Sequence, residues 1–331
     1  MKKEELLYLL DRTEGYLSGG ELSRRLGVTR AAVWKGMEAL RQEGWVIESA
    51  PGRGYRLSAG PDRLRAGVLA GAGEQVGAVV ECLDTVDSTN NVCKLRAAQG
   101  APHGLVVTAE EQTGGRGRRG RSFQSPRGKG LYLSALLRPS VEPARAVGLT
   151  PWVAVAVCRA IEGLTGLRPA IKWTNDILLE GKKLCGILTE MEVEGETGLL
   201  RYVVTGIGIN VYQTEEDFSP EVAALAASLA QHMETPPTRV ALARALIGEL
   251  DRMSREFPAE GAGYLAEYRA RCMTPGHEVE VLTPAGSRRG FAREVDGDFR
   301  LVVAFEDGSV EALSSGEVSI RVPGAPGSPL D

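Results

Sequence analysis

A segment rich in arginine and glycine has the residue types that point most directly to chemistry. Guanidinium groups offer planar pairs of N–H donors to carboxylates and phosphates, and interleaved glycines let the backbone approach a ligand closely. The composition therefore predicts an anion-binding loop that orders when a negative ligand binds. Its six cationic side chains, with no acidic residue between 116 and 129, are Arg116, Arg118, Arg119, Arg121, Arg127 and Lys129.

The alternative interpretation of such a segment is a disordered tail that binds nucleic acid. The flanking sequence favours a loop instead, because residues 105–109 and 131–137 are short apolar runs typical of buried strands. We therefore expect the cationic segment to lie at the rim of a sheet, where loops commonly carry function.

Three further segments have the composition of ligand-binding loops. Residues 87–91 (DSTNN) place hydroxyls and amides where a strand gives way to a helix, although Ser88 could serve as an ordinary N-cap. Residues 172–176 (KWTND) follow a strand with a cation, an amide and a carboxylate, a sequence that buried strands seldom contain without a polar partner. In residues 182–188 (KKLCGIL) a hairpin turn accounts for Lys182, whereas Lys183 is the better candidate for an active-site cation.

The composition of the 331 residues, 43% hydrophobic and 25% charged, is that of a soluble globular protein with two or three domains. No apolar run approaches the roughly 20 residues that cross a bilayer, so we expect no membrane partner. Five scattered cysteines without a C-x-x-C pair indicate reduced thiols and a cytoplasmic location. The three dispersed histidines lack metal-ligand spacing, so we assign neither a protein-bound metal nor a histidine base.

Residues 1–60 have the pattern of a winged helix-turn-helix and carry a net charge of +2, against −6 for the rest of the chain. The pattern predicts helices near 6–10, 21–26 and 30–42, with Thr29 as N-cap of the third, and two strands around the turn at 51–54. A protein-docking module is the alternative, but the basic third helix and the basic wing favour DNA. The expected DNA-binding residues are Thr29, Arg30, Trp34, Lys35, Arg41 and Arg53.

The remaining chain divides into a linker or hinge at 61–78, a mixed α/β domain at 79–271 and a small β barrel at 272–331. Neighbouring hairpin-like strands favour a mixed or antiparallel sheet rather than a Rossmann repeat. In the central domain we expect helices at 89–99, 150–164, 221–231, 238–256 and 261–270.

Six motifs occur in a fixed order along the chain. They are DSTN at 87–90, E-x-Q-x-x-G-R-G-R-x-G-R at 110–121, K-W-x-N-D at 172–176, K-L-x-G-I-L at 183–188, G-x-G-I-N at 206–210 and G-E-x-S-I-R at 316–321. Together they resemble the bifunctional biotin protein ligases, which also repress biotin-synthesis genes. The resemblance implies an α+β multidomain fold: an N-terminal winged helix-turn-helix, a mixed α/β catalytic domain of the biotin/lipoate ligase type and a C-terminal SH3-like β barrel.

The resemblance also implies roles for residues. Lys183, Arg116, Arg118 and Asp176 would be catalytic, and Asp176 would orient or deprotonate the acceptor amine. Biotin would be bound by Ser88, Thr89, Asn90, Gln112, Gly115, Arg116, Gly117, Arg118, Lys183, Gly186, Gly206 and Gly208. ATP would be bound by Arg118, Arg121, Phe123, Asn175, Asp176, Lys183, Asn210 and Arg321. Two positions depart from the family pattern, since Thr174 replaces a usual proline and Phe123 a common tryptophan.

The implied reaction is that of a biotin–[biotin carboxyl-carrier protein] ligase. ATP and biotin form biotinyl-5'-AMP, with Mg²⁺ accompanying the nucleotide, and the adenylate serves as both intermediate and corepressor. The implied partners are the biotin carboxyl carrier protein of acetyl-CoA carboxylase or another biotin-dependent carboxylase, operator DNA, and a second copy of the chain when the adenylate is bound. Two alternatives stay open: a lipoate-type ligase, and a regulator that senses a small acid without catalysis.

Overall fold

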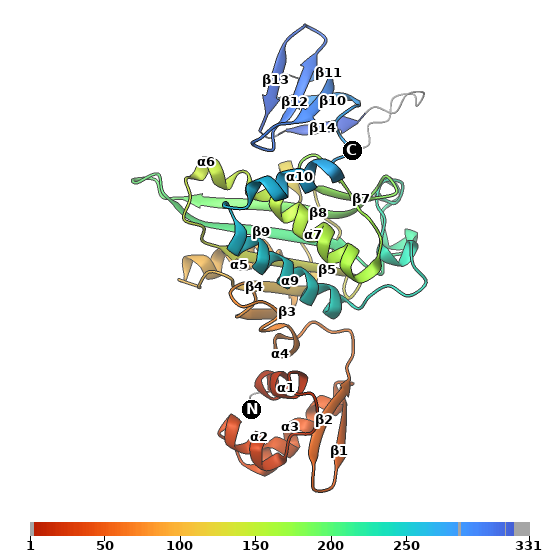
Figure 1. Cartoon of the computed structure of the whole chain (residues 1–331). Helices are drawn as coiled ribbons and strands as arrows, with labels where there is room; N and C mark the ends of the chain where they lie inside the picture. Colours follow the sequence, from red (N-terminus) through yellow and green to blue (C-terminus); the bar gives the residue numbers. More distant parts are fainter. Residues whose placement is uncertain (1–2, 284–285, 315, 321–331) are drawn as a thin grey trace.

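The computed structural model describes residues 3–283, 286–314 and 316–320. Three regions follow one another along the molecule, as Figure 1 shows: a small helical region at the N-terminus, a central sheet flanked by helices, and a second sheet at the C-terminal end. Arg321, which we expected at the nucleotide, lies outside the described residues.

The N-terminal region is the predicted winged helix-turn-helix. It comprises α1 (Lys3–Asp11), α2 (Gly19–Leu26), α3 (Arg30–Gln42), and the antiparallel strands β1 (Val46–Ala50) and β2 (Gly54–Ala59). Gly27 ends α2 in the left-handed conformation, with φ of 65°, and the Thr29 hydroxyl caps α3 by accepting from the backbone N–H of Ala32. This turn therefore forms as the sequence predicts.

The segment from 61 to 78, predicted as a linker, packs against both of its neighbours. It contains a short helix, α4 (Ala66–Leu69), which packs on α1. Three apolar side chains of the segment, Leu64, Val68 and Val76, are buried. Arg65 pairs with Glu4 and Glu43 of the winged helix. Apolar burial and ion pairs thus fix the course of this segment.

The central sheet has seven strands, and β3 pairs with β4 in parallel while the other neighbouring pairs are antiparallel. This arrangement agrees with the expected mixed sheet. The strand order is β3 (Val80–Val86), β4 (Val106–Gln112), β5 (Gly130–Leu137), β9 (Leu200–Asn210), β8 (Lys182–Val193), β7 (Asp176–Leu179) and β6 (Ala170–Lys172).

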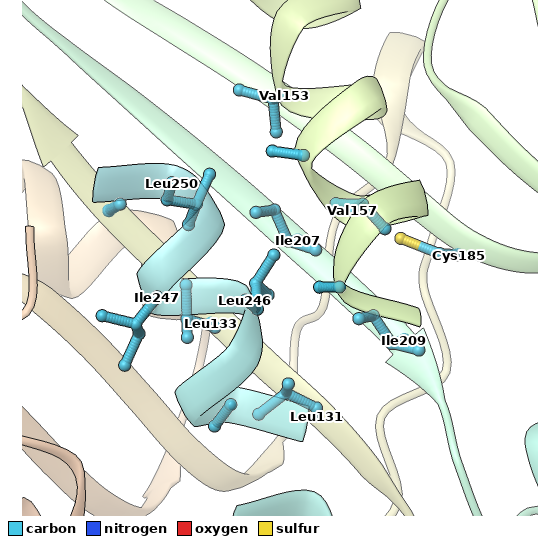
Figure 2. Close-up of a cluster of buried hydrophobic side chains, with 14 of the residues drawn as sticks. Leu131, Leu133, Val153, Val157, Cys185, Ile207, Ile209, Leu246, Ile247 and Leu250 are labelled. Carbon is cyan, nitrogen blue, oxygen red and sulfur yellow. The ribbon is translucent and has the colours of Figure 1, made fainter. Parts of the chain in front are cut away.

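Helices cover the two faces of this sheet unequally. The helices α7 (Leu149–Thr165) and α9 (Arg239–Glu256) bury one face, and Figure 2 shows Val157 and Leu246 packed among side chains of β5, β8 and β9. On the other face α5 (Thr89–Ala98) covers β4, β5 and part of β9. Because alternate residues of a strand point to opposite faces, Gly186 and Leu188 of β8 and Gly206, Gly208 and Asn210 of β9 are left to line the site described below.

Two expectations from the sequence are wrong, one about a helix and one about the length of the apolar runs. Residues 221–231 do not form one helix: the segment contains only the short helix α8 (Pro220–Ala223) and the 3₁₀ turn η3 (Leu229–Gln231). The stretch Pro143–Thr165, which includes α6 (Pro143–Ala146) and α7, is long and apolar enough to pass as a membrane span by length and composition. However, 61% of its apolar window is buried inside the structure, as expected for a core helix.

The C-terminal part of the chain is rich in strands, as predicted. After α10 (Gly261–Arg271), five antiparallel strands pair in the order β13, β12, β11, β10, β14. The last described segment, Gly316 followed by the strand β14, brings Gly316 and Val318 to a cavity on the central sheet that is described below. The strands are β10 (Glu278–Thr283), β11 (Gly286–Val295), β12 (Leu301–Phe305), β13 (Val310–Leu313) and β14 (Glu317–Ile320).

Candidate active site

A cavity of about 270 Å³ lies on the sheet face that α5 leaves open. It gathers segments that are far apart in the sequence. These are the three polar segments at 87–91, 172–176 and 182–188, and the arginine-rich segment that begins at Arg116, called the cationic loop below. Of the expected ligand residues, those that line it are Ser88, Thr89, Asn90, Gln112, Arg116, Gly117, Arg118, Arg121, Phe123, Asn175, Asp176, Lys183, Gly186, Gly206, Gly208 and Asn210. Gly115 lies beside it, and its missing Cβ would meet the carbonyl oxygen of Phe123 at 2.3 Å.

The floor of the cavity is made of glycines on β9. A Cβ at Gly206 would lie 2.2 Å from Oδ1 of Asn90, and one at Gly208 would lie 2.5 Å from Cε1 of Phe123. Both distances are too short for any larger residue without displacement of these side chains. The glycines of the G-x-G-I-N motif therefore create room for Asn90 and Phe123 above the sheet.

A chain of polar side chains forms one end of the cavity. The backbone N–H and hydroxyl of Thr89 lie 2.9 Å and 3.1 Å from Oε1 of Gln112, whose Nε2 donates to Ser125. The Ser134 hydroxyl lies 2.6 Å from Oδ1 of Asn90 and 2.8 Å from Oγ1 of Thr89. Ser88 occupies the N-cap position of α5, yet in this described segment its side chain makes no capping hydrogen bond, so the ordinary capping interpretation is not supported.

The cationic loop folds over the cavity as a small irregular hairpin. The N–H of Gly117 donates to the carbonyl of Arg121 at 2.7 Å, and residues 118–120 form a 3₁₀ turn, η1. Arg116 donates to Asn91, whereas Arg118 reaches across the cavity to Oδ1 of Asn175 at 2.9 Å and to the carbonyl of Gly316 at 3.0 Å. Arg118 thus connects the loop to the KWTND segment and to the C-terminal sheet.

Opposite the loop, Nζ of Lys183 lies 2.8 Å from Oδ1 of Asp176. The strand pairing of β7 with β8 places Asp176 directly opposite Gly186. Asn175 donates to the carbonyl of Ile187. Asn210 donates to the carbonyl of Ala227 at 2.9 Å, so its amide holds the segment after β9 against the site. The cavity is therefore lined by a paired cation and carboxylate, Lys183 and Asp176, together with arginines of the cationic loop.

Sequence reasoning did not anticipate several residues of the site. Ser134 and Glu190 lie inside strands, and no neighbouring motif sets them apart in the sequence. Only the pairing of the strands shows that they contact Asn90 of the DSTN segment. The apolar wall comes from the segment that we expected to be a helix, and nothing in its composition suggested a ligand. Its residues at the cavity are Val222, Leu225 and Ala226, and Phe218, just before the segment, lies beside them in the lining.

The winged helix exposes most of the residues that we expected to contact DNA. Arg30, Trp34 and Lys35 are exposed on α3, and Arg53 at the wing tip packs over the ring of Tyr16 at 4.3 Å. Arg41 is different, because its guanidinium donates to the carbonyl of Ile47 and to Glu38. These contacts connect α3 to the wing and indicate a structural role for Arg41.

Comparisons with known proteins find family matches for both the central domain and the winged helix-turn-helix. Residues 82–210 match the Biotin/lipoate A/B protein ligase family, and residues 2–56 match an HTH domain. The chain is 33% identical to a protein named bifunctional ligase/repressor BirA from Bacillus spizizenii, covering 92% of this chain and 94% of that one. It is 32% identical to the Escherichia coli protein of the same name, covering 96% of each.

Among solved structures, a biotin protein ligase from Aquifex aeolicus, in complex with biotin and ATP, superimposes with a TM-score of 0.61 at 26% identity. The match covers 73% of this chain and 98% of that one. The matches to the Bacillus spizizenii and Escherichia coli proteins, which cover 92% and 96% of this chain, extend across the winged helix, the central domain and the C-terminal sheet.

Proposed function

The chain belongs to the family of bifunctional biotin ligase/repressors, and we propose that the cavity described above is where it activates biotin with ATP. It is an ATP-dependent biotin protein ligase and a biotin-responsive transcriptional repressor. The observation that carries the assignment is the convergence of Lys183, Asp176 and the cationic loop on one cavity, in a chain that begins with a winged helix-turn-helix.

Adenylation requires the biotin carboxylate to attack the α-phosphate of ATP, so two anions must approach each other. Lys183, Arg116 and Arg118 supply the positive charge that offsets this repulsion and stabilises the charge developing on the phosphoryl oxygens. The polar end at Thr89, Asn90 and Gln112 binds the ureido ring, which directs the carboxylate of the valeryl chain towards Lys183.

The nucleotide side of the cavity is formed by Arg121, Phe123, Asn175 and Asn210. The ring of Phe123 lies over Gly186 and Gly208, where a planar adenine can stack against it. Among the described residues that line the cavity, Asp176 is the acidic one, and it is already paired with Lys183. This donor set suits Mg²⁺ carried on the triphosphate oxygens rather than held in a cage of protein ligands.

Biotinyl-5'-AMP is a mixed anhydride that water hydrolyses, so the site must cover it until the acceptor arrives. The cationic loop provides the cover, and Arg118 holds it down through Asn175 and Gly316. The acceptor is a lysine of a biotin carboxyl carrier protein. Asp176 orients or deprotonates the amine, which attacks the acyl carbon and releases AMP.

The repressor activity uses the same adenylate as corepressor. A winged helix reads a palindromic operator as a pair, so the adenylate-bound chain acts as a homodimer that places two α3 helices on successive half-sites. Carrier protein competes for the surface that dimerisation needs. The chain therefore ligates when acceptor is abundant and represses when acceptor is scarce, and both activities belong in the cytoplasm.

One assay tests the ligase and separates it from the two alternatives. The protein is incubated with ATP, Mg²⁺, an apo carrier domain, and either labelled biotin or labelled lipoate. Labelling of the carrier by biotin alone supports the assignment. Labelling by lipoate alone would favour a lipoate-type ligase, and binding of biotin without pyrophosphate release would favour a sensor without catalysis.

A further inference from the structure

Glu190 lies just behind the polar end of the cavity and is absent from all six motifs. It sits on β8, and its carboxylate accepts from Nδ2 of Asn90 at 2.9 Å and from Nζ of Lys94 at 2.8 Å. Arg116 of the cationic loop lies 3.3 Å from the same carboxylate. Burial raises the pKa of Glu190, but hydrogen bonds from Lys94 and Asn90 and the nearby charges outweigh it, so the pKa lies below its ordinary value.

The ionised carboxylate fixes the orientation of the Asn90 amide. An ionised carboxylate accepts hydrogen bonds and donates none, so it must face the NH₂ group of Asn90. The carbonyl of Leu188, also an acceptor, lies 3.2 Å from the same nitrogen. Both N–H groups of Asn90 are therefore taken up by acceptors on β8, and Oδ1 is left facing the Ser134 hydroxyl above Gly206 on the floor of the cavity.

This orientation determines the next two hydrogens in the chain. Oδ1 of Asn90 can only accept, so the Ser134 hydroxyl, 2.6 Å away, must donate to it. The single hydrogen of Ser134 is then used, and its oxygen becomes an acceptor towards Thr89 at 2.8 Å. The other neighbour of the Thr89 hydroxyl is Oε1 of Gln112, which is also an acceptor. The Thr89 hydrogen therefore points into the protein towards one of these two oxygens.

We propose that Glu190 is a positioning residue that sets the direction of the hydrogen-bond chain from Asn90 through Ser134 to Thr89, so that Asn90 and Thr89 present acceptor oxygens to the ligand. This surface fits a ligand with N–H donors. Resting on the proposed function, the inference assigns the two oxygens to the ureido N–H groups of biotin. Glu190 touches neither biotin nor ATP; it acts through Asn90.

The test compares Glu190→Leu, which keeps a similar volume without an acceptor, with Glu190→Gln, which retains an oxygen for Asn90. Calorimetry measures the binding of biotin and of two analogues in which one or the other ureido N–H is replaced by oxygen. The wild-type protein should prefer biotin to at least one analogue. Since a buried amide without its partner costs on the order of 1–3 kcal/mol, Glu190→Leu should weaken biotin binding about tenfold to a hundredfold and reduce that preference.

The change in preference separates positioning from a general loss of structure. A structural defect weakens biotin and analogue equally, whereas loss of hydrogen-bond direction weakens biotin more. Glu190→Gln should restore most of the preference, and KM for ATP should stay within about twofold of wild type. The matched control is Glu192→Leu, which alters an exposed carboxylate two residues further along β8 and should leave biotin binding unchanged.

Ser134→Ala provides a second test that leaves Glu190 and its charged neighbours intact. It removes the link between Asn90 and Thr89, but Glu190 still orients the Asn90 amide and Gln112 still accepts from the Thr89 hydroxyl, so it should keep the preference for biotin over the analogue. An unchanged preference in a folded Glu190→Leu protein would overturn the inference while leaving the proposed function standing. If wild-type protein bound no biotin, the proposed function itself would fall, and the inference with it.

Discussion

The guanidinium of Arg239 donates to the carboxylate of Glu110 at 2.6 Å, and the two side chains are 4% and 9% exposed. Arg239 begins α9, whereas Glu110 lies on β4 two residues before Gln112, so the pair connects the helical layer to a strand that enters the cavity. Arg239 also contacts Asp62, and Glu110 accepts from the N–H of Leu64. One buried network thus joins the central domain to the segment that follows the winged helix.

We expect Arg239→Ala to lower the free energy of unfolding by about 3–5 kcal/mol, because it leaves Glu110 as an uncompensated buried charge. Urea denaturation followed by circular dichroism measures the change. The control is Arg252→Ala, which breaks an exposed pair with Glu256 and should cost less than about 1 kcal/mol. Equal losses for the two variants would contradict the importance of this network.

Lys183→Ala should reduce adenylate formation on the order of 10²-fold or more, since it removes a cation from the place where phosphoryl charge develops. Pyrophosphate release with saturating biotin and ATP provides the measurement. Lys182→Ala removes the adjacent exposed lysine and should retain the wild-type rate. A normal rate in Lys183→Ala would exclude its catalytic role.

Arg118→Gly should still form biotinyl-5'-AMP but release it early, because the loop loses its contacts with Asn175 and Gly316. The expected outcome is biotin labelling of lysines on bystander proteins. Dialysis of the pre-formed complex measures retention directly, and Arg127→Ala, an exposed position outside the cavity, is the control. Retention equal to wild type would rule out this function of Arg118.

Gly206→Ala should weaken biotin binding at least tenfold, because the new methyl group would lie 2.2 Å from Oδ1 of Asn90 and displace that amide. Calorimetric titration with biotin tests this. Gly195→Ala, in the turn between β8 and β9, adds a methyl group with no neighbour within 4 Å among the described atoms and should bind normally. Normal binding by Gly206→Ala would show that the floor tolerates a side chain.

Biotinyl-5'-AMP should convert the protein from monomer to dimer and should raise its affinity for the operator over the same range of adenylate concentration. The reason is that the loops around 111–129 and 210–217 become ordered when they bind the adenylate, which allows two chains to pair. Sedimentation with and without the adenylate, alongside DNA-binding measurements, tests the coupling. Addition of apo carrier protein should reverse dimerisation. If neither the association state nor the DNA affinity changed when the adenylate was added, the ligase site and the winged helix would be shown to act independently.

The sequence by itself determined the features that depend on neighbouring residues. The cap at Thr29, the left-handed turn at Gly27 and the alternating pattern of the wing are local, so the winged helix could be predicted before its packing was known. The cationic loop and the polar segments were likewise visible as composition, and their order carried the resemblance to a family.

The tertiary structure decided the features that depend on strand pairing and packing. Arg41 is a basic residue on the third helix, so the sequence predicts a DNA contact. In the structure the wing packs beside this helix, and the Arg41 guanidinium donates to the carbonyl of Ile47 instead. Residues 221–231 have helical composition, but they are held in an irregular path along the cavity, where Lys183 and Asn210 bond their backbone. Glu190 and Ser134 belong to different strands, and only the register of the sheet brings both to Asn90. Contacts between distant residues arise from the packing of whole elements, which no local pattern encodes.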